Sequence, residues 1–401
     1  MKKVLIFLLN LVLFLNFSTA PVLAAANVTF DNQGTWIING EREFIYYINQ
    51  IPRPAQTATT NEIWERMVNY YHVNSVAAGM SPKADQLAQQ YGIYLLIEKP
   101  QVKYNDWNNH DTKATILDVA SRPNRLFFFA SEENTITDDR IFQGYDYLSQ
   151  TFPKIPSHIN FTNMATKYSS QYSDYIRRTK AAVISSHVGD AAANTAIMVR
   201  FRDEIPSLKS AFMLFRKDEN PQLEKDIFQS IVKGINGIQF WEMYGSGAHY
   251  VGEWGETIAR VGGYLKEIMP GLVAPNRQYK TDYLIAKGED NRWYVIATPE
   301  TGTLTVTGLP KNTEFERLFY GSGMITTNSA GTLTDNSAGK IKIYRQKSTS
   351  SPLPSSSPTG KVGDLNNDDH VNLADYNLLV SGYGTTYNLS HYNRLVQGYG
   401  Q

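Results

Sequence analysis

The stretch Arg125–Asn134 reads RLFFFASEEN, an apolar run that ends in polar residues. A continuous run of this length, rich in aromatic residues, is typical of a strand buried on both faces of a parallel sheet. Its end carries two adjacent carboxylates, Glu132 and Glu133. In such sheets catalytic groups lie at the carboxyl ends of the strands, where the loops form a crevice. Glu132 and Glu133 are therefore the first candidates for chemistry.

Seven more strand-like stretches alternate with helical patterns between Phe30 and about Leu272. The eight strands are expected at Phe44–Asn49, Ser75–Gly79, Tyr94–Glu98, Leu126–Ser131, Ser157–Phe161, Ala181–Ser186, Ala211–Phe215 and Ile238–Trp241. Helices are expected at Asn61–His72, Pro82–Gln90, Asp139–Thr151, Ala191–Asp203 and Glu256–Ile268. Eight alternations in roughly 240 residues predict an α/β fold of the (β/α)8 TIM-barrel type, with an open doubly wound sheet as the alternative.

A further helix is expected after the seventh strand, where Asn220 can cap it, Pro221 suits its first position and Gly234 ends it. No glycine-rich phosphate turn follows the first strand, which argues against a nucleotide-binding version of the fold. Lys and Arg total 38, as do Asp and Glu, so the formal net charge is zero. This balance gives no electrostatic footprint for nucleic acid, and no nucleic-acid partner is expected.

The first 26 residues have the pattern of a secretory signal peptide. Lys2 and Lys3 precede an apolar run over Val4–Phe17, and the small residues Ala24–Ala26 follow. This pattern predicts a secreted, extracellular protein with no stable membrane span after cleavage, and leaves attachment at a cell surface open. The chain has no cysteine, so disulfide bonds are excluded.

After Pro275 short alternating runs separated by turn residues predict a small antiparallel β-sandwich. Its strands are expected at Tyr279–Ala286, Arg292–Ala297, Thr303–Thr307, Glu314–Tyr320, Gly331–Thr334 and Lys340–Tyr344. A Ser-, Thr- and Pro-rich stretch then predicts an extended linker. The expected segments are a signal peptide (1–26), a barrel (27–275), a sandwich (276–345), a linker (346–361) and a C-terminal module (362–401).

Oxygen-bearing side chains recur in the C-terminal module at the spacing of a calcium loop. Positions 1, 3, 5, 9 and 12 of the loop are Asp364, Asn366, Asp368, Asn372 and Asp375, and position 7 offers the carbonyl of His370. A helix is expected to follow over Ala374–Val380. We therefore predict bound Ca²⁺ as a cofactor of this module, with a solvated acidic turn as the alternative.

A repeat supports a specialised role for the module. The segment 372–384, NLADYNLLVSGYG, recurs sixteen residues later as 388–400, NLSHYNRLVQGYG. His391 replaces Asp375 in the second copy, so a single ion is expected. One calcium loop, a duplicated helix and a Ser/Pro linker resemble a dockerin, a short α-helical module of the EF-hand type. The resemblance implies a cohesin-type scaffold protein as a partner.

The layout of a secreted barrel, a sandwich and a dockerin-like tail is similar to that of clan A glycoside hydrolases. The resemblance implies hydrolysis of a polysaccharide or oligosaccharide by two carboxyl groups, with no cofactor for catalysis. In that clan the acid/base glutamate ends strand four and the nucleophile ends strand seven. By order these positions fall at Glu132 and Glu133 and at Asp218 and Glu219.

Strand alternation separates the two glutamates of strand four. It puts Phe127, Phe129, Ser131 and Glu133 on one side, opposite to Glu132. Glu133 is therefore the preferred acid/base and Glu219 the preferred nucleophile. The remaining candidates for catalysis are Glu132, beside the preferred acid, and Glu242 on strand eight.

Aromatic and polar residues near the strand ends are candidates for binding sugar. Aromatic faces can stack on sugar rings, and amide or imidazole groups can bind hydroxyls. The candidates are Glu98, Trp107, Asn163, His187, Trp241 and Tyr244, with Tyr104 and Asn160 beside them. A non-catalytic glycan-binding or scaffold-associated protein built on a degenerate barrel remains the alternative, because fold does not fix function.

Overall fold

The computed structural model describes residues 26–48, 61–77, 81–97, 108–122, 124–132, 139–167, 169–187, 189–215, 222–240, 253–347, 365, 371 and 373–382. The chain divides into two compact units, Met1–Lys347 and Ser348–Gln401. The first unit contains a barrel and the β-sheets that follow it in sequence. Each unit is described below by itself.

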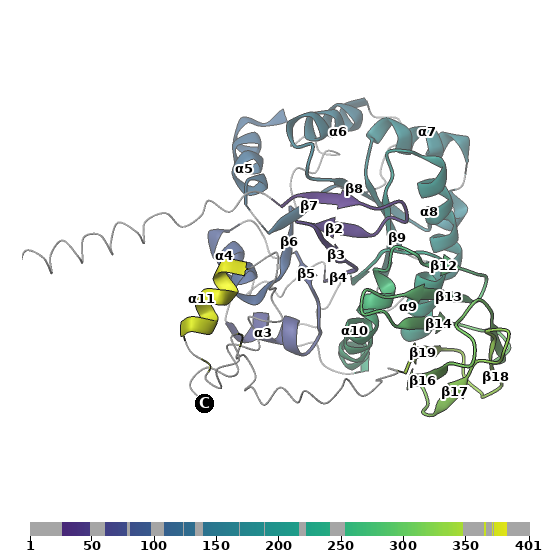
Figure 1. Cartoon of the computed structure of the whole chain (residues 1–401). Helices are drawn as coiled ribbons and strands as arrows, with labels where there is room; N and C mark the ends of the chain where they lie inside the picture. The colour runs from purple at the N-terminus through teal and green to yellow at the C-terminus, as the bar shows by residue number, and fades with distance from the viewer. Residues whose placement is uncertain are drawn as a thin grey trace, which may run out of the picture. The chain divides into compact units, whose positions relative to one another are not determined.

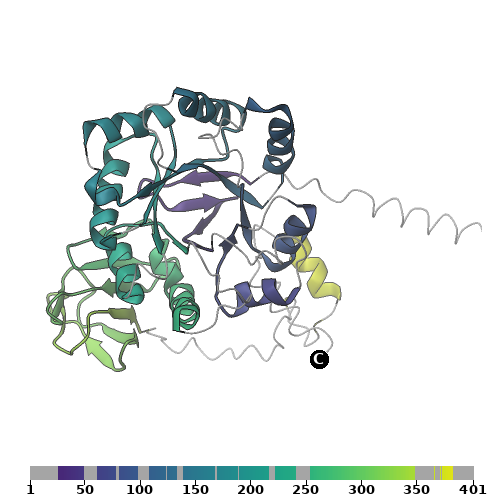
Figure 2. The same ribbon diagram turned by 180° about the vertical axis from the view of Figure 1, so that it is seen from behind.

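Eight parallel strands close into a barrel, and helices surround it (Figures 1 and 2). Around the barrel the order is β10-β11-β4-β5-β6-β7-β8-β9. The strands are β4 (Ile45–Ile48), β5 (Ser75–Val76), β6 (Tyr94–Ile97), β7 (Arg125–Glu132), β8 (Ser157–Thr162), β9 (Val183–His187), β10 (Ser210–Phe215) and β11 (Gly237–Phe240). All eight predicted strands are confirmed, and closure of the sheet excludes the open doubly wound alternative.

The helices follow the apolar periodicity of the sequence. They are α3 (Asn61–Asn69), α4 (Pro82–Tyr91), α5 (His110–Ala120), α6 (Asp139–Thr151), α7 (Ser170–Thr179), α8 (Ala191–Glu204), α9 (Leu223–Val232) and α10 (Glu253–Leu272). The N-cap side chains of Ser81 and Asp190 accept from Ala84 N and Ala193 N over 3.2 and 2.8 Å, which fixes the starts of α4 and α8. Helices α5 and α7 were not predicted.

The predicted cap of α9 is wrong. The helix begins at Leu223 with Gln222 in the N-cap position, and Asn220 and Pro221 lie outside the described residues. Its predicted end is confirmed, because Gly234 has a φ of 100° that an L-residue rarely adopts.

An antiparallel sheet that the sequence did not predict closes the amino end of the barrel. It consists of β1 (Val28–Phe30), β2 (Trp36–Ile38) and β3 (Glu41–Glu43), and β2 and β3 are seen across the barrel in Figure 1. The fully buried ring of Trp36 lies 5.5 Å from that of Phe127 and 5.4 Å from that of Phe212. Its Nε1 donates to Ser210 Oγ over 2.9 Å, so the indole fills the barrel floor without an unpaired donor.

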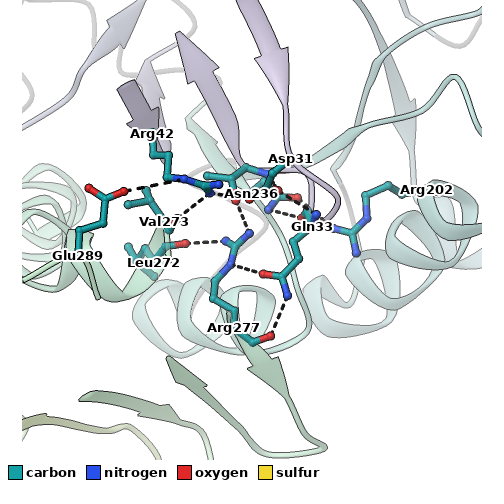
Figure 3. Close-up of polar contacts among 10 residues, drawn as sticks. Asp31, Gln33, Arg42, Arg202, Asn236, Leu272, Val273, Arg277 and Glu289 are labelled. Carbon is teal, nitrogen blue, oxygen red and sulfur yellow. Dashed lines mark hydrogen bonds and ion pairs between the residues drawn. The ribbon is translucent and has the colours of Figure 1, made fainter. Parts of the chain in front are cut away.

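Polar contacts anchor this sheet to the end of α10 (Figure 3). Arg277 Nε donates to Gln33 Oε1 over 3.1 Å, and Gln33 Nε2 donates to the Arg277 carbonyl over 2.8 Å. Arg42 pairs with Asp31 at 2.6 Å and donates to the Val273 carbonyl over 3.2 Å. Burial alone would raise the pKa of Asp31, but the hydrogen bonds from Arg42 and from backbone amides lower it. The carboxylate is thus held ionised beside the arginines.

The remainder of the first unit is antiparallel, as predicted. Six strands pair in the order β12-β13-β14-β19-β16-β17, and β15 pairs with β18. Their bounds are β12 (Gln278–Tyr279), β13 (Tyr283–Lys287), β14 (Trp293–Ala297), β15 (Leu304–Val306), β16 (Glu314–Phe319), β17 (Met324–Thr326), β18 (Leu333–Asp335) and β19 (Lys342–Gln346). Leu284, Tyr294 and Ile296 belong to the same apolar cluster as the barrel helices, so the two parts share a core.

In the second unit, helix α11 (Leu373–Gly382) confirms the helix expected after the calcium loop. Leu379 and Val371 are buried, with Leu365 packed against them. No helix among the described residues is long and apolar enough to span a membrane.

Candidate functional site

A buried polar chain runs between β8 and β9 inside the barrel. His158 Nε2 lies 2.7 Å from Ser185 Oγ, and Ser185 Oγ donates to Asn160 Oδ1 over 2.7 Å. His158 and Ser185 are fully buried, and Asn160 is 2% exposed. Because register pairs His158 with Val183 and Asn160 with Ser185, the chain climbs toward the carboxyl ends of the strands.

Hydrogen bonding fixes the proton on His158. The single hydroxyl proton of Ser185 is directed at Asn160, so the Ser185 oxygen accepts from a protonated His158 Nε2. Burial lowers the pKa of His158 to about 3, and the rings of Phe127 and Phe212 lie against the imidazole at 5.6 and 6.2 Å. His158 is therefore neutral at ordinary pH and acts as a hydrogen-bond donor that orients its neighbours.

Two predicted sugar-binding residues lie together where β8 and β9 end. Asn163 N donates to the His187 carbonyl over 2.6 Å, and His187 Nε2 lies 3.3 Å from Thr162 Oγ1. Asn163 adopts a left-handed backbone with φ 48°, and its side chain is packed against Gly189, where an added Cβ would lie 3.1 Å from Asn163 Oδ1. Both Asn163 and His187 are partly exposed, so polar groups line this part of the mouth.

A bulge in β7 changes which glutamate is in register with the polar chain. Phe129 pairs with His158 and Glu132 pairs with Asn160, so three steps along β7 match two along β8. Strict alternation, which put Ser131 on the side of Phe127 and Phe129, is therefore wrong at this strand, whereas the expected placement of Glu133 opposite Glu132 stays a prediction. The backbone of Glu132 occupies the register of Asn160, and Glu133 lies outside the described residues. The catalytic roles of both glutamates stay predictions.

A second buried polar pair lies across β4 and β11. Gln239 Nε2 donates to Tyr47 OH over 3.2 Å, and both residues are fully buried. Sequence reasoning did not select either residue, nor His158 and Ser185. The available signal was a polar residue inside an otherwise apolar barrel strand, as in Gly-Ile-Gln-Phe at 237–240.

Seven of the predicted catalytic and sugar-binding residues lie outside the described residues. They are Glu98, Trp107, Glu133, Glu219, Trp241, Glu242 and Tyr244. Of the predicted calcium ligands, Asp364, Asn366, Asp368, His370 and Asn372 also lie outside them.

Asp375 is the predicted calcium ligand that the structure does describe. It is fully buried, and its Oδ1 accepts a hydrogen bond from Leu365 N over 2.6 Å. This contact joins the first turn of α11 to Leu365, and the role of Asp375 as a calcium ligand stays a prediction. Within the described ranges no group of three or more His, Asp or Glu side chains could hold a metal ion.

No protein-family model matches the chain, and no curated protein matches it in sequence. Solved structures with a similar fold include an α-amylase from Anoxybacillus, at 9% identity and a TM-score of 0.49, covering 76% of this chain and 99% of that one. An FMN-binding β-glucuronidase from Facaelibacterium prausnitzii is 14% identical with a TM-score of 0.44, covering 81% of this chain and 57% of that one.

A psychrophilic glycoside hydrolase family 10 endo-β-1,4-xylanase is 10% identical with a TM-score of 0.39, covering 54% of this chain and 96% of that one. At these identities and TM-scores the likeness carries no argument about function. The chemistry of this chain is therefore argued from its own residues.

Proposed function

We propose that the chain is a secreted glycoside hydrolase that acts on a polysaccharide or oligosaccharide at the carboxyl end of its barrel. One observation carries the proposal. The fourth barrel strand, β7, ends in a glutamate whose backbone is in register with Asn160, at the top of a buried polar chain. In (β/α)8 barrels the carboxyl ends of strands are where catalytic groups gather.

The groups at this end suit an uncharged, hydroxyl-rich ligand. Thr162, Asn163 and His187 offer hydroxyl, amide and imidazole groups, which donate to and accept from sugar hydroxyls. The amino end of the barrel is filled by Trp36 and its neighbours, so substrate would enter from the opposite end. This polarity agrees with the expected position of the acids.

The proposed chemistry uses two carboxyl groups on either side of the scissile bond. Glu133 or Glu132 would protonate the leaving oxygen. Glu219, with Glu242 as the substitute, would either attack the anomeric carbon or activate a water molecule that does so. A separation of about 5 Å between the carboxyl groups would give retention of configuration, and about 6.5–9.5 Å would give inversion.

The C-terminal unit is proposed to be a dockerin-like module that binds Ca²⁺ and docks on a cohesin-type protein. The loop spacing and the buried Asp375 support this assignment. Calcium would organise the loop that begins α11 and takes no part in the barrel chemistry.

The deciding experiment measures reducing-sugar release from plant, algal and microbial polysaccharides by the purified protein. Glu132→Gln and Glu133→Gln are compared with Glu204→Gln, an exposed residue paired with Arg200 on α8. Release by the parent and by Glu204→Gln, but not by one strand-four variant, is the expected result. Folded protein that binds a glycan and releases nothing from any substrate would replace the proposal with the non-catalytic alternative.

A further inference from the structure

Arg317 on β16 is buried with half of its guanidinium unused. Its side chain is 8% exposed. Nη1 donates to Ser337 Oγ over 2.6 Å and lies 3.5 Å from Asp335 Oδ2. Nε and Nη2 are buried and have no hydrogen-bond partner in the part of the chain that the structure describes. An unsatisfied buried guanidinium nitrogen is costly, which makes this residue an exception that requires a reason.

The two unused nitrogens form one edge of the guanidinium, the fork that takes a carboxylate by two parallel hydrogen bonds. Arg345 on the adjacent strand β19 shows what such a fork binds in this sheet. Its Nε and Nη2 lie 2.7 and 2.6 Å from Glu316 Oε1, and its Nη1 lies 3.1 Å from Glu267 Oε1. The fork of Arg317 has no such carboxylate among the described residues.

The charges of Arg317, Lys342 and Asp335, which form one cluster, also indicate that an anion is missing. Lys342 Nζ, fully buried, lies 3.3 Å from Asp335 Oδ2 and donates to the carbonyls of Asp335 and Ser337 over 2.9 Å. Tyr344 OH also donates to Asp335 Oδ2. The single carboxylate of Asp335 therefore pairs with two buried cations, Arg317 and Lys342. One positive charge in this cluster is left without a counter-charge.

The backbone of two glycines packs close to the guanidinium. A Cβ added to Gly321 would lie 2.7 Å from Arg317 Nε, and one added to Gly339 would lie 3.5 Å from Nη2. These glycines belong to two exposed loops, Gly321–Gly323 and Asn336–Lys340. The exposed Gly321 loop thus lies directly over Nε, and the loop with Gly339 lies beside Nη2, so a ligand reaches these nitrogens only when the loops move.

We propose that the guanidinium fork of Arg317 is the recognition element of a binding site for a carboxylate-bearing ligand, reached when the loops Gly321–Gly323 and Asn336–Lys340 separate. A planar monoanion matches both the fork and the single surplus charge. The carboxylate comes from a sugar acid within a glycan or from a free small acid. The site lies in the β-sheet part of the first unit and does not depend on hydrolysis by the barrel.

The test is calorimetric titration of the full chain with uronic-acid oligosaccharides, their methyl esters, acetate and sulfate. Arg317→Met is compared with Arg292→Met, whose arginine lies in the same part of the chain and pairs with Asp290 at 2.6 Å. We expect Arg317→Met to weaken binding of the acid by at least about tenfold, the loss of one charge-assisted contact, and Arg292→Met to leave it unchanged.

The methyl esters keep the sugar ring and remove the charge, so they test the site in the parent protein even if Arg317→Met does not fold. Weak binding of the esters supports the proposal. Competition by acetate would then assign the ligand as a free carboxylate, and binding of the oligosaccharide alone would assign it as a sugar acid. Equal affinity for acid and ester, binding unchanged in folded Arg317→Met, or no binding of any carboxylate would overturn it.

Discussion

Ser185 donates its hydroxyl proton to Asn160 Oδ1 over 2.7 Å, and this bond sets the direction of the hydrogen bond between Ser185 and His158. Because the Ser185 oxygen must then accept from His158, the three residues form a chain with one direction. The chain joins two neighbouring strands inside the barrel and ends at the residue in register with Glu132. It is the best-defined polar structure beneath the proposed catalytic end.

Ser185→Ala should break this chain at its centre. The variant leaves His158 Nε2 and Asn160 Oδ1 without their shared partner, so we expect a loss of about 1–3 kcal/mol in the free energy of unfolding. Urea denaturation measures the loss. Ser185→Thr keeps a hydroxyl and should recover part of it. An alanine variant as stable as the parent would contradict the hydrogen-bond assignment.

The same hydrogen-bonded chain predicts how substitution of Asn160 changes activity if the barrel is a glycosidase. Asn160 is held by Ser185 and lies at the level of Glu132 in the sheet. Asn160→Ala should therefore lower kcat by about tenfold with a smaller change in KM, because it acts on the position of the reacting groups. Equal effects of Asn160→Ala and of the exposed control Glu204→Gln would remove Asn160 from the site.

His158 predicts a loss of stability in acid. Its pKa is lowered to about 3 by burial, so the unfolded chain binds a proton near its ordinary pKa of 6.5 while the folded chain does not. Stability is fully present above pH 6.5 and falls as the pH drops toward 3. Between pH 7 and pH 5 the loss should be about 2 kcal/mol. His158→Gln should reduce this dependence, whereas His110→Gln, at an exposed position, should not.

Glu43 predicts the opposite dependence at higher pH. Burial raises its pKa to about 7, the hydrogen bond from Asn74 partly opposes this, and Glu41 adds to it. Because its pKa is raised in the folded state, Glu43 contributes fully to the free energy of unfolding below pH 4.5, and this contribution is lost as the pH rises through 7. Glu43→Gln should therefore raise stability at pH 8 by about 1 kcal/mol, a value discounted for partial exposure. Denaturation at pH 5 and pH 8 tests the sign.

Trp36→Ala should empty the barrel floor. The indole is fully buried between Phe127 and Phe212, so we expect a loss of about 3–5 kcal/mol in the free energy of unfolding. Leu117→Ala, at a position 52% exposed on α5, should change it by less than about 0.5 kcal/mol. Comparable losses in the two variants would mean that the tryptophan does not close the barrel.

Calcium should stabilise the C-terminal unit alone. Chelation by EDTA is expected to lower its melting temperature and leave that of the first unit unchanged, because binding to the folded state adds directly to stability. Asp364→Ala should abolish calcium binding in calorimetric titration. A parent chain that shows no heat of calcium binding would refute the calcium loop.

The sequence predicted the barrel well because several of its parallel strands, buried on both faces, are largely apolar runs bounded by helical patterns. Ala211–Phe215, which reads AFMLF, is such a run. The sheet β1–β3 was missed because its three-residue strands gain their burial from Trp36 meeting distant strands, and no local pattern encodes that contact.

The candidate site was harder to predict than the fold. A bulge between Phe129 and Ser131 shifts the register of β7 against β8 by one residue, and the amino-acid sequence of β7 does not indicate this bulge. Asn163 and His187, each predicted to bind sugar hydroxyls after its own strand, lie beside each other in the structure, and their binding role stays a prediction. Ser185 and Gln239 were not selected. Their importance comes from partners on other strands, which only the folded sheet brings together.

The barrel floor also has a consequence for synthesis of the chain. The side chain of Gln33 is hydrogen-bonded to Arg277, 244 positions later in the sequence, and that of Trp36 to Ser210, 174 positions later. A nascent chain on the ribosome must therefore hold its first sheet without its final partners until the last barrel helix has emerged. At about 5–20 residues per second this wait lasts tens of seconds at the slow end of the range, during which Trp36 is open to chaperones and to neighbouring nascent chains.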